Sequence, residues 1–158
     1  MIGIEKSSER LAQAKKNCPN ATFMGGDLLS KKMIENLIFQ TRKRYDLVIA
    51  NPPFDLALQF LLVAFTLLRL RSDGSKGRAI FLLPSDFFEA SVKRSRIYNL
   101  MDWSVVTEYK LGHLSFYAHN RRAEKKSVDS LFIIQKGREG KFQHTVINAR
   151  SAGMLSIE

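Results

Sequence analysis

Four consecutive residues carry the most specific chemistry in this sequence: Asn51, Pro52, Pro53 and Phe54, called here the NPPF motif. A carboxamide oxygen next to a rigid proline carbonyl makes a pair of hydrogen-bond acceptors suited to an exocyclic amino group. The ring of Phe54 adds a flat apolar surface on which a nucleobase can stack. A simple turn that ends a strand is the alternative interpretation, because Asn and Pro are common turn residues.

A buried strand is expected to present this motif. Residues 45–50, with the sequence YDLVIA, are rich in apolar and β-branched side chains and end at the prolines, which is typical of a strand covered on both faces. In an open α/β sheet, ligands bind outside the carboxyl ends of the strands. The position of the motif therefore favours a functional role over a turn alone.

The rest of the chain alternates strand and helix patterns, until two strands follow one another near the end. This order predicts a doubly wound α/β sheet with a terminal antiparallel strand pair, in a single domain over residues 1–158. The expected strands are residues 2–4, 21–24, 45–50, 78–83, 103–109 and 128–135, and the expected helices are residues 8–17, 30–41, 55–70 and 86–98.

Composition indicates a polyanionic partner. The chain has 25 Lys and Arg against 15 Asp and Glu, a formal net charge of +10, and such an excess favours binding to nucleic acid. The single cysteine excludes an internal disulfide and fits a reducing cytoplasm. No apolar stretch reaches the ~20 residues of a membrane span, and no His/Cys spacing predicts a metal site.

A basic and aromatic stretch after residue 112 is the best candidate for contacts to nucleic acid. Aromatic rings that can stack on bases alternate there with cations that can pair with phosphates. A solvated, hairpin-like connection is the alternative. The residues that we expect to contact nucleic acid are Phe116, Tyr117, Arg121, Arg122 and Lys125.

Residues 45–54, YDLVIANPPF, resemble the catalytic region of amino-directed class I methyltransferases, and in particular the N6-adenine DNA methylases of bacteria and phages. These enzymes use S-adenosylmethionine and share a Rossmann-like sheet. Their motif is Asn or Asp, Pro, Pro and an aromatic residue, and it binds the amino group that is methylated. The resemblance extends over roughly residues 2–137. It implies that Asn51, Pro52, Pro53 and Phe54 are catalytic, with Asn51 also next to the cofactor.

Two upstream segments match the cofactor-binding positions of the same family. Glu5, followed by Lys6, matches the acidic residue that holds the ribose hydroxyls. Asp27, followed by Leu28, matches the segment whose Asp accepts a hydrogen bond from the cofactor adenine. Each acid also has a local alternative: Glu5 can end a strand or cap a helix, and Asp27 can cap a turn or helix.

The family's glycine-rich cofactor loop and its first strand come before the acidic residue, which here is already Glu5. We therefore expect a sheet without its first strand, with a gap at its middle, and an incomplete cofactor site. The chain is then a fragment, begins at a start assigned too late, or is a relative that lost catalysis. A partner chain or an N-terminal segment would complete the site, and no target-recognition domain is visible.

Three functions remain open. The first is an N6-adenine DNA methyltransferase in the cytoplasm of a bacterial or phage-infected cell. The second keeps the reaction but acts on an RNA adenine or a protein glutamine; the glutamine-directed relatives usually carry Tyr where Phe54 stands here. The third is a non-catalytic nucleic-acid-binding relative of the same fold.

Overall fold

The computed structural model describes residues 1–41, 45–69, 77–88, 103–112, 116–118, 121–123, 128–136 and 143–145. The chain divides into two compact units, Met1–Arg44 and Tyr45–Glu158. The expectation of a single domain stays a prediction.

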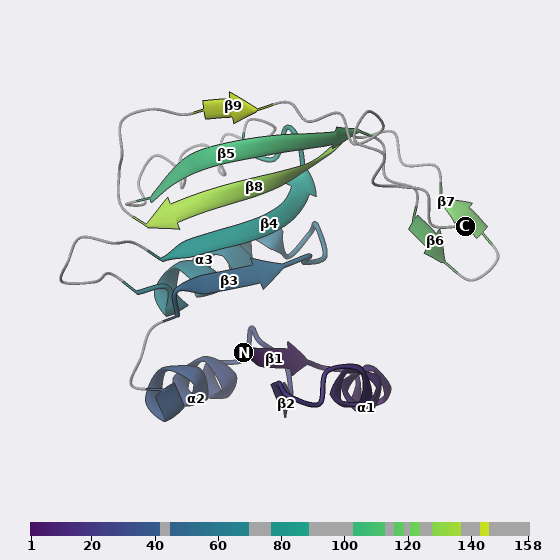
Figure 1. Cartoon of the computed structure of the whole chain (residues 1–158), viewed down its shortest axis with the longest axis vertical. Coiled ribbons are helices and arrows are strands. Elements are labelled where there is room, and N and C mark those ends of the chain that lie inside the picture. Colours follow the sequence, from purple (N-terminus) through teal and green to yellow (C-terminus); the bar gives the residue numbers. More distant parts are fainter. Residues whose placement is uncertain are drawn as a thin grey trace. The chain divides into compact units, whose positions relative to one another are not determined.

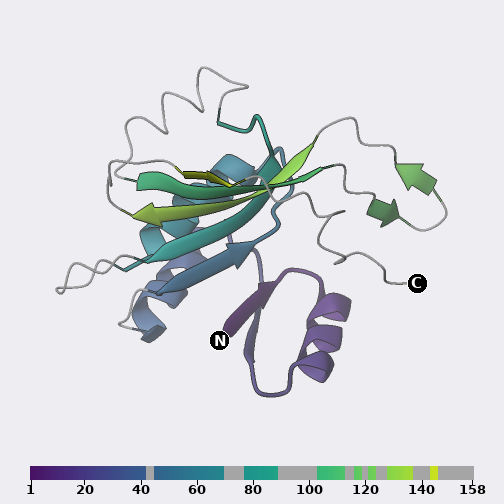
Figure 2. The ribbon, with the colours of Figure 1, turned by 45° about the horizontal axis from the view of Figure 1, so that its top comes forward.

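The first unit contains β1 (Ile2–Glu5), α1 (Ser8–Asn17), β2 (Thr22–Gly25) and α2 (Lys31–Thr41). The two strands pair in parallel, with Glu5 opposite Gly25, and α1 lies alongside them (Figure 2). Helix α1 begins where the sequence predicts, because the Ser7 hydroxyl caps it by accepting a hydrogen bond from the Arg10 N–H.

The second unit is built on a five-stranded sheet in the order β3-β4-β8-β5-β9 (Figure 1). Strand β3 runs parallel to β4, whereas β8 runs antiparallel to both β4 and β5. The predicted α/β sheet with a terminal antiparallel pair is therefore confirmed. The bounds are β3 (Leu47–Ala50), α3 (Ala57–Leu67), β4 (Arg78–Pro84), β5 (Trp103–Gly112), β8 (Asp129–Lys136) and β9 (Gln143–Thr145).

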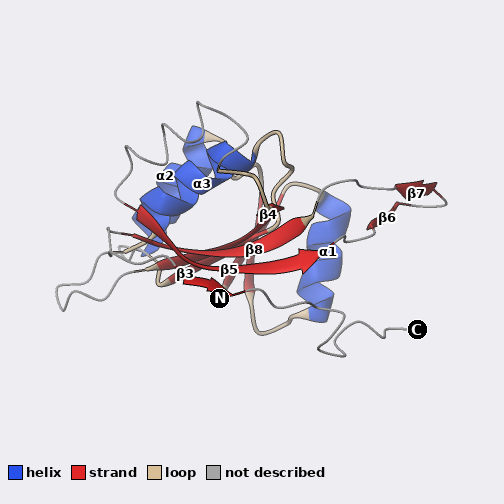
Figure 3. Cartoon of the chain, turned by 90° about the horizontal axis from the view of Figure 1, so that it is seen from above, coloured by secondary structure: helices blue, strands red, loops and turns tan. Residues whose placement is uncertain are grey.

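Helix α3 packs on one face of this sheet (Figure 3). Alternation along the strands sends every second side chain into one continuous buried cluster. Phe81 and Leu83 of β4 are fully buried in it, and Trp103 of β5 stacks edge-on against Phe65 of α3. The buried members of the cluster are Ala57, Leu61, Ala64, Leu68, Ala79, Phe81, Leu83, Phe87, Trp103, Val105, Phe132 and Ile134.

Strands β1 and β3 each have one neighbour among the described strands, β2 and β4 respectively. No pairing joins β1 to β3 within the described part of the chain. The missing first strand and the gap in the sheet stay predictions. Strand β3 was expected to be covered on both faces, but none of its residues is buried, and it exposes two large aliphatic side chains, Leu47 at 48% and Ile49 at 68%. The reason is its place at the edge of the described five-stranded sheet. Proteins normally protect such apolar edge strands, because unpaired strand edges recruit other strands.

The structure differs from the expected elements in three places. Helix α3 is shorter than residues 55–70, because the chain turns at residues 54–56 and Leu68 instead forms a parallel bridge with Tyr45. Strand β9 was not predicted. The helix expected over residues 86–98 falls mostly outside the described residues, which show a turn at 85–88. None of the described helices has the length and apolar character needed to cross a bilayer.

Candidate active site

The NPPF motif leaves the carboxyl end of β3 and leads directly into α3. The Leu56 and Ala57 N–H groups donate to the carbonyls of Pro53 and Phe54, at 3.0 and 3.4 Å. These two carbonyls therefore close the turn, and the carbonyl expected to accept from a substrate is that of Pro52. The motif thus ends a strand, as its simplest interpretation requires, and does so at the edge where α/β sheets bind ligands.

Burial separates the four motif residues by role. Pro52 is buried, whereas Asn51 and Phe54 are exposed, Phe54 at 36%. A buried proline with a restricted φ angle holds the backbone between them. The Asn51 carboxamide and the Phe54 ring are thus accessible and rigidly supported. A nucleobase that stacks on Phe54 and donates its amino group to Asn51 would need this arrangement.

A chain of polar side chains lies at the same end of the sheet, and the sequence analysis did not single it out. The Ser130 hydroxyl donates to Glu108 Oε1 at 2.7 Å, and the Ser85 and Ser130 hydroxyl oxygens are 2.6 Å apart. Glu108 is 4% exposed and Ser130 is fully buried. The signal in the sequence was Glu108 inside the strand predicted over residues 103–109. A buried Glu is rare unless it is paired, so its position indicated a polar partner nearby.

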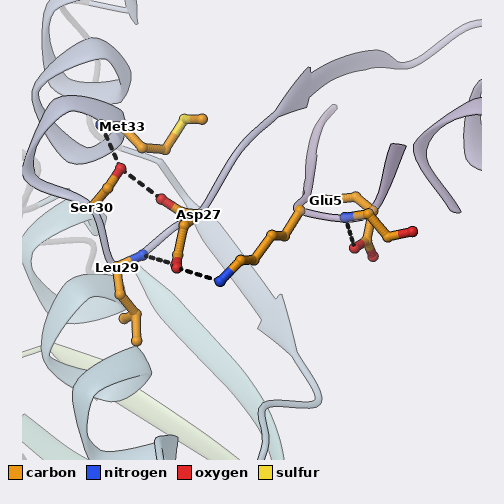
Figure 4. Close-up of polar contacts among 7 residues, drawn as sticks. Glu5, Asp27, Leu29, Ser30 and Met33 are labelled. Carbon is orange, nitrogen blue, oxygen red and sulfur yellow. Dashed lines mark hydrogen bonds and ion pairs between the residues drawn. The ribbon is translucent and has the colours of Figure 1, made fainter. Parts of the chain in front are cut away.

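Glu5 and Asp27 follow the parallel strands β1 and β2 at the same end of the pair, and Lys6 forms an ion pair with Asp27 there (Figure 4). Lys6 Nζ lies 3.1 Å from Asp27 Oδ2, and the Gly26 N–H donates to the Glu5 carbonyl at 3.0 Å. Gly26 has a φ of 148°, which favours glycine and allows the tight connection from β2 to Asp27. Two segments that are far apart in sequence thus place both predicted cofactor carboxylates at one sheet edge.

Both carboxylates also have the local roles that the residue types suggest. Glu5 Oε1 accepts from the Ser7 N–H at 2.8 Å, just before α1. Asp27 Oδ1 accepts from the Leu29 N–H at 2.9 Å, and the Ser30 hydroxyl continues the turn by accepting from the Met33 N–H. Each carboxylate oxygen has two lone pairs, so these bonds leave acceptor capacity for ligand hydroxyl or amino groups. The two carboxylates therefore suit the adenosine part of a nucleotide-like cofactor. Leu28, between Asp27 and Leu29, is half-buried.

The pKa of Asp27 lies below its ordinary value of 3.8, first because the Leu29 N–H bonds its charged form and second because Lys6 does. We expect Lys6→Met to raise this pKa only part of the way, since the Leu29 N–H remains. Because the folded-state pKa is lowered, the stabilising contribution is complete above pH ~3.8 and is lost as pH falls through the folded value. Carbon-13 NMR titration of the Asp27 carboxyl measures the shift. An unchanged pKa in the variant would contradict the role given to Lys6.

The backbone of the basic segment forms a hairpin of β6 (Phe116–Ala118) and β7 (Arg121–Ala123). Tyr117 pairs directly with Arg122 in this antiparallel ladder. The hairpin was the alternative to a gripping loop, but a hairpin can also carry nucleic-acid contacts, so the predicted role stays a prediction. Lys125 lies outside the described residues.

No protein-family profile matches the chain, and no curated protein matches it. Solved structures do. One, named as a modification subunit of a type I restriction enzyme from Vibrio vulnificus YJ016, has a TM-score of 0.69 at 17% identity, covering 92% of this chain and 34% of that one. The EcoKI M protein has a TM-score of 0.66 at 21% identity, covering 87% and 31%. The predicted O-methyltransferase Atu636 from Agrobacterium tumefaciens has a TM-score of 0.58 at 15% identity, covering 93% and 67%.

These likenesses establish the fold: the chain has the Rossmann-like α/β fold of class I methyltransferases. The chain spans about a third of the length of the two restriction-system proteins.

Proposed function

We propose that this chain is part of an N6-adenine DNA methyltransferase that uses S-adenosylmethionine. The observation that carries the proposal is the NPPF motif at the carboxyl end of β3, with Asn51 and Phe54 exposed and Pro52 buried. A ligand site belongs at this edge, and the fold is one that methyltransferases share.

The motif acts by positioning the adenine amine. The Asn51 side-chain oxygen and the Pro52 carbonyl accept hydrogen bonds from the two N6 hydrogens, while the Phe54 ring stacks on the base. These bonds draw the nitrogen lone pair out of conjugation with the ring and aim it out of the ring plane. Orientation and fixed dipoles supply the acceleration. When bound, S-adenosylmethionine supplies the electrophilic methyl group.

The cofactor would be held by the first unit through its adenosine. Glu5 would accept from the ribose hydroxyls and Asp27 from the adenine amine, with Lys6 and Leu28 next to them in the sequence. Asn51, in the second unit, is proposed as a cofactor residue from the family resemblance alone. Support comes from the positions of Glu5 and Asp27 at the carboxyl ends of two parallel strands, where nucleotide-binding sheets carry such acids.

DNA is the proposed acceptor. The net charge of +10 favours a polyanion, and Phe54 suits a base taken out of its stack. Phe116, Tyr117, Arg121, Arg122 and Lys125 would contact the strand. Among the similar folds, two proteins are named as modification components of restriction systems. We place the protein in the cytoplasm of a bacterial or phage-infected cell.

A further polypeptide segment would complete the cofactor site. Support comes from β3, which has one described neighbour and exposes Leu47 and Ile49. An apolar strand pairing at its edge would bury both side chains and satisfy backbone groups that β4 does not reach. A partner chain or a further segment of the protein would supply this strand.

The test is transfer of tritiated methyl from S-adenosylmethionine to duplex DNA by the chain alone and by the chain joined to upstream coding sequence. The digested product should contain N6-methyldeoxyadenosine. Label in RNA or in a glutamine peptide instead would support the second function. DNA binding without transfer, and without heat of S-adenosylmethionine binding in calorimetric titration of both folded proteins, would favour the non-catalytic relative and contradict the proposal.

A further inference from the structure

Three polar side chains from three separate segments form a continuous chain at the carboxyl end of β4. The Ser85 hydroxyl oxygen and backbone nitrogen both lie 3.0 Å from the Val128 carbonyl oxygen. The Ser85 hydroxyl oxygen also lies 2.6 Å from that of Ser130, and Ser130 donates to Glu108 at 2.7 Å. Because a hydroxyl has one proton, Ser85 then donates either to Ser130 or to Val128, while its N–H bonds the Val128 carbonyl in both cases. The loop after β4, the start of β8 and the middle of β5 are thereby tied together. We call Ser85, Ser130 and Glu108 the polar tie.

A β-bulge puts Glu108 into this chain. Val105 pairs with Ile134, but the next pair is Thr107 with Ile133, so Val106 is an extra residue in β5. In a regular strand, Glu108 would face away from Val105, because side chains alternate. The bulge reverses the alternation and turns Glu108 to the face of Val105, the face that α3 covers.

The polar tie interrupts an otherwise apolar face. Farther along the same face, the strands contribute Ala79, Phe81, Phe132 and Ile134 to the buried cluster. Burying hydroxyl and carboxyl groups costs free energy unless every group is bonded, and an apolar filling would avoid that cost. A fully buried serine and a nearly buried glutamate at this one end therefore call for a local reason.

That end of the face adjoins the NPPF motif. Ala50 pairs with Phe81, so the chain beyond Ala50 runs beside the segment that ends β4 and leads into Ser85. The turn after Ser85 is closed by the Phe87 N–H, which donates to the Pro84 carbonyl at 2.9 Å. Phe87 then packs in the same buried cluster as Ala57, the first residue of α3 and the hydrogen-bond partner of Phe54. A shift of the turn at residues 84–87 would therefore displace the NPPF motif through the packing of Phe87 and Ala57.

We propose that Ser85, Ser130 and Glu108 are positioning residues of the acceptor site. They fix the position of the turn at residues 84–87 relative to β8 and β5. In this proposal, that turn lines the acceptor site next to the NPPF motif. This inference rests on the proposed function. Its consequence is selectivity for the adenine amine. The Asn51 side-chain oxygen and the Pro52 carbonyl can both bond the amine only when the turn at residues 84–87 keeps its position.

Matched substitutions separate hydroxyl chemistry from shape. Ser85→Thr keeps the hydroxyl and adds a methyl group, and Ser85→Val has the shape of Thr with a methyl group in place of the hydroxyl. Glu108→Gln keeps an acceptor oxygen for Ser130, and Glu108→Leu removes it. Thr66→Val is the control for losing a hydroxyl away from the proposed site. The Thr66 hydroxyl donates to the Leu62 carbonyl on an exposed part of α3.

The probes are two labelled single strands about 12 nucleotides long, oligodeoxyadenosine and oligodeoxyinosine, in which an oxygen replaces the amine. Fluorescence anisotropy gives both dissociation constants. We expect the unmodified chain to prefer adenine by about tenfold. Ser85→Val and Glu108→Leu should lower that preference roughly three- to tenfold while oligodeoxyinosine binds as before. Ser85→Thr, Glu108→Gln and Thr66→Val should keep it.

Urea unfolding of each variant distinguishes positioning from stability. If Ser85→Val and Glu108→Leu unfold more easily but keep the adenine preference, the polar tie is structural only and the inference is wrong. If the unmodified chain shows no preference for adenine, the acceptor site itself fails, and the inference fails with it. Loss of the adenine preference in Ser85→Val but not in Ser85→Thr, and in Glu108→Leu but not in Glu108→Gln, supports the positioning role.

Discussion

Replacing Asn51 by alanine should lower the rate of the proposed methyl transfer to adenine by about 10²- to 10³-fold, the usual cost of removing one preorganised hydrogen-bonding group from a reacting centre. Asn51 is exposed at the end of β3, where its side chain can meet a substrate. Without the carboxamide oxygen, the amine keeps its lone pair in the ring system. Single-turnover transfer of tritiated methyl to duplex DNA, in a form of the protein that binds S-adenosylmethionine, measures the rate.

Asn51→Asp is the matched control, because a carboxylate still offers an acceptor oxygen at the same place and Asp occurs at this position in the resembled family. It should retain most of the activity that alanine loses. DNA affinity should stay within about twofold in both variants, since phosphate contacts dominate affinity. An alanine variant as fast as the unmodified chain would show that the motif is only a turn.

Two phenylalanines should respond to alanine substitution in opposite ways. Phe81→Ala should cost about 3–5 kcal/mol of unfolding free energy, because it opens a cavity among fully packed neighbours. Phe81 is completely buried in the cluster formed by α3 and the sheet, whereas Phe54 is 36% exposed. Phe54→Ala should change stability by about 1 kcal/mol or less. It should instead weaken binding to an adenine strand by roughly 1–3 kcal/mol, the value of one stacked base.

The single tryptophan makes the comparison direct. Trp103 is 4% exposed and lies in the same buried cluster as Phe81, so its fluorescence reports unfolding of the second unit. Anisotropy with oligodeoxyadenosine reports binding by the Phe54 variant at urea concentrations where it is folded. A large loss of stability in Phe54→Ala with unchanged adenine binding would show that Phe54 is a packing residue and does not bind the base.

Several features could be predicted from the sequence alone because they depend on local patterns. An apolar run followed by prolines predicts a strand that ends at a candidate site, and β3 ends at the NPPF motif. The predicted burial of this strand is wrong: none of its four residues is buried, and it lies at the edge of the described sheet. A serine before a helical pattern predicts a cap, which Ser7 provides. The order of strands and helices predicts the class of sheet, because connections in α/β folds follow few rules. The likeness of the whole chain to methyltransferase folds confirms that class.

Only the tertiary structure decided which distant residues meet. No local pattern shows that Ser85, Glu108 and Ser130 join into one chain, since the join depends on strand register and on an extra residue in β5. Strand β9 is three residues long, and its pairing with β5 rather than its own pattern makes it a strand. Contacts between segments far apart in the chain depend on packing and hydrogen bonding of the whole fold, so local patterns in the sequence do not reveal them.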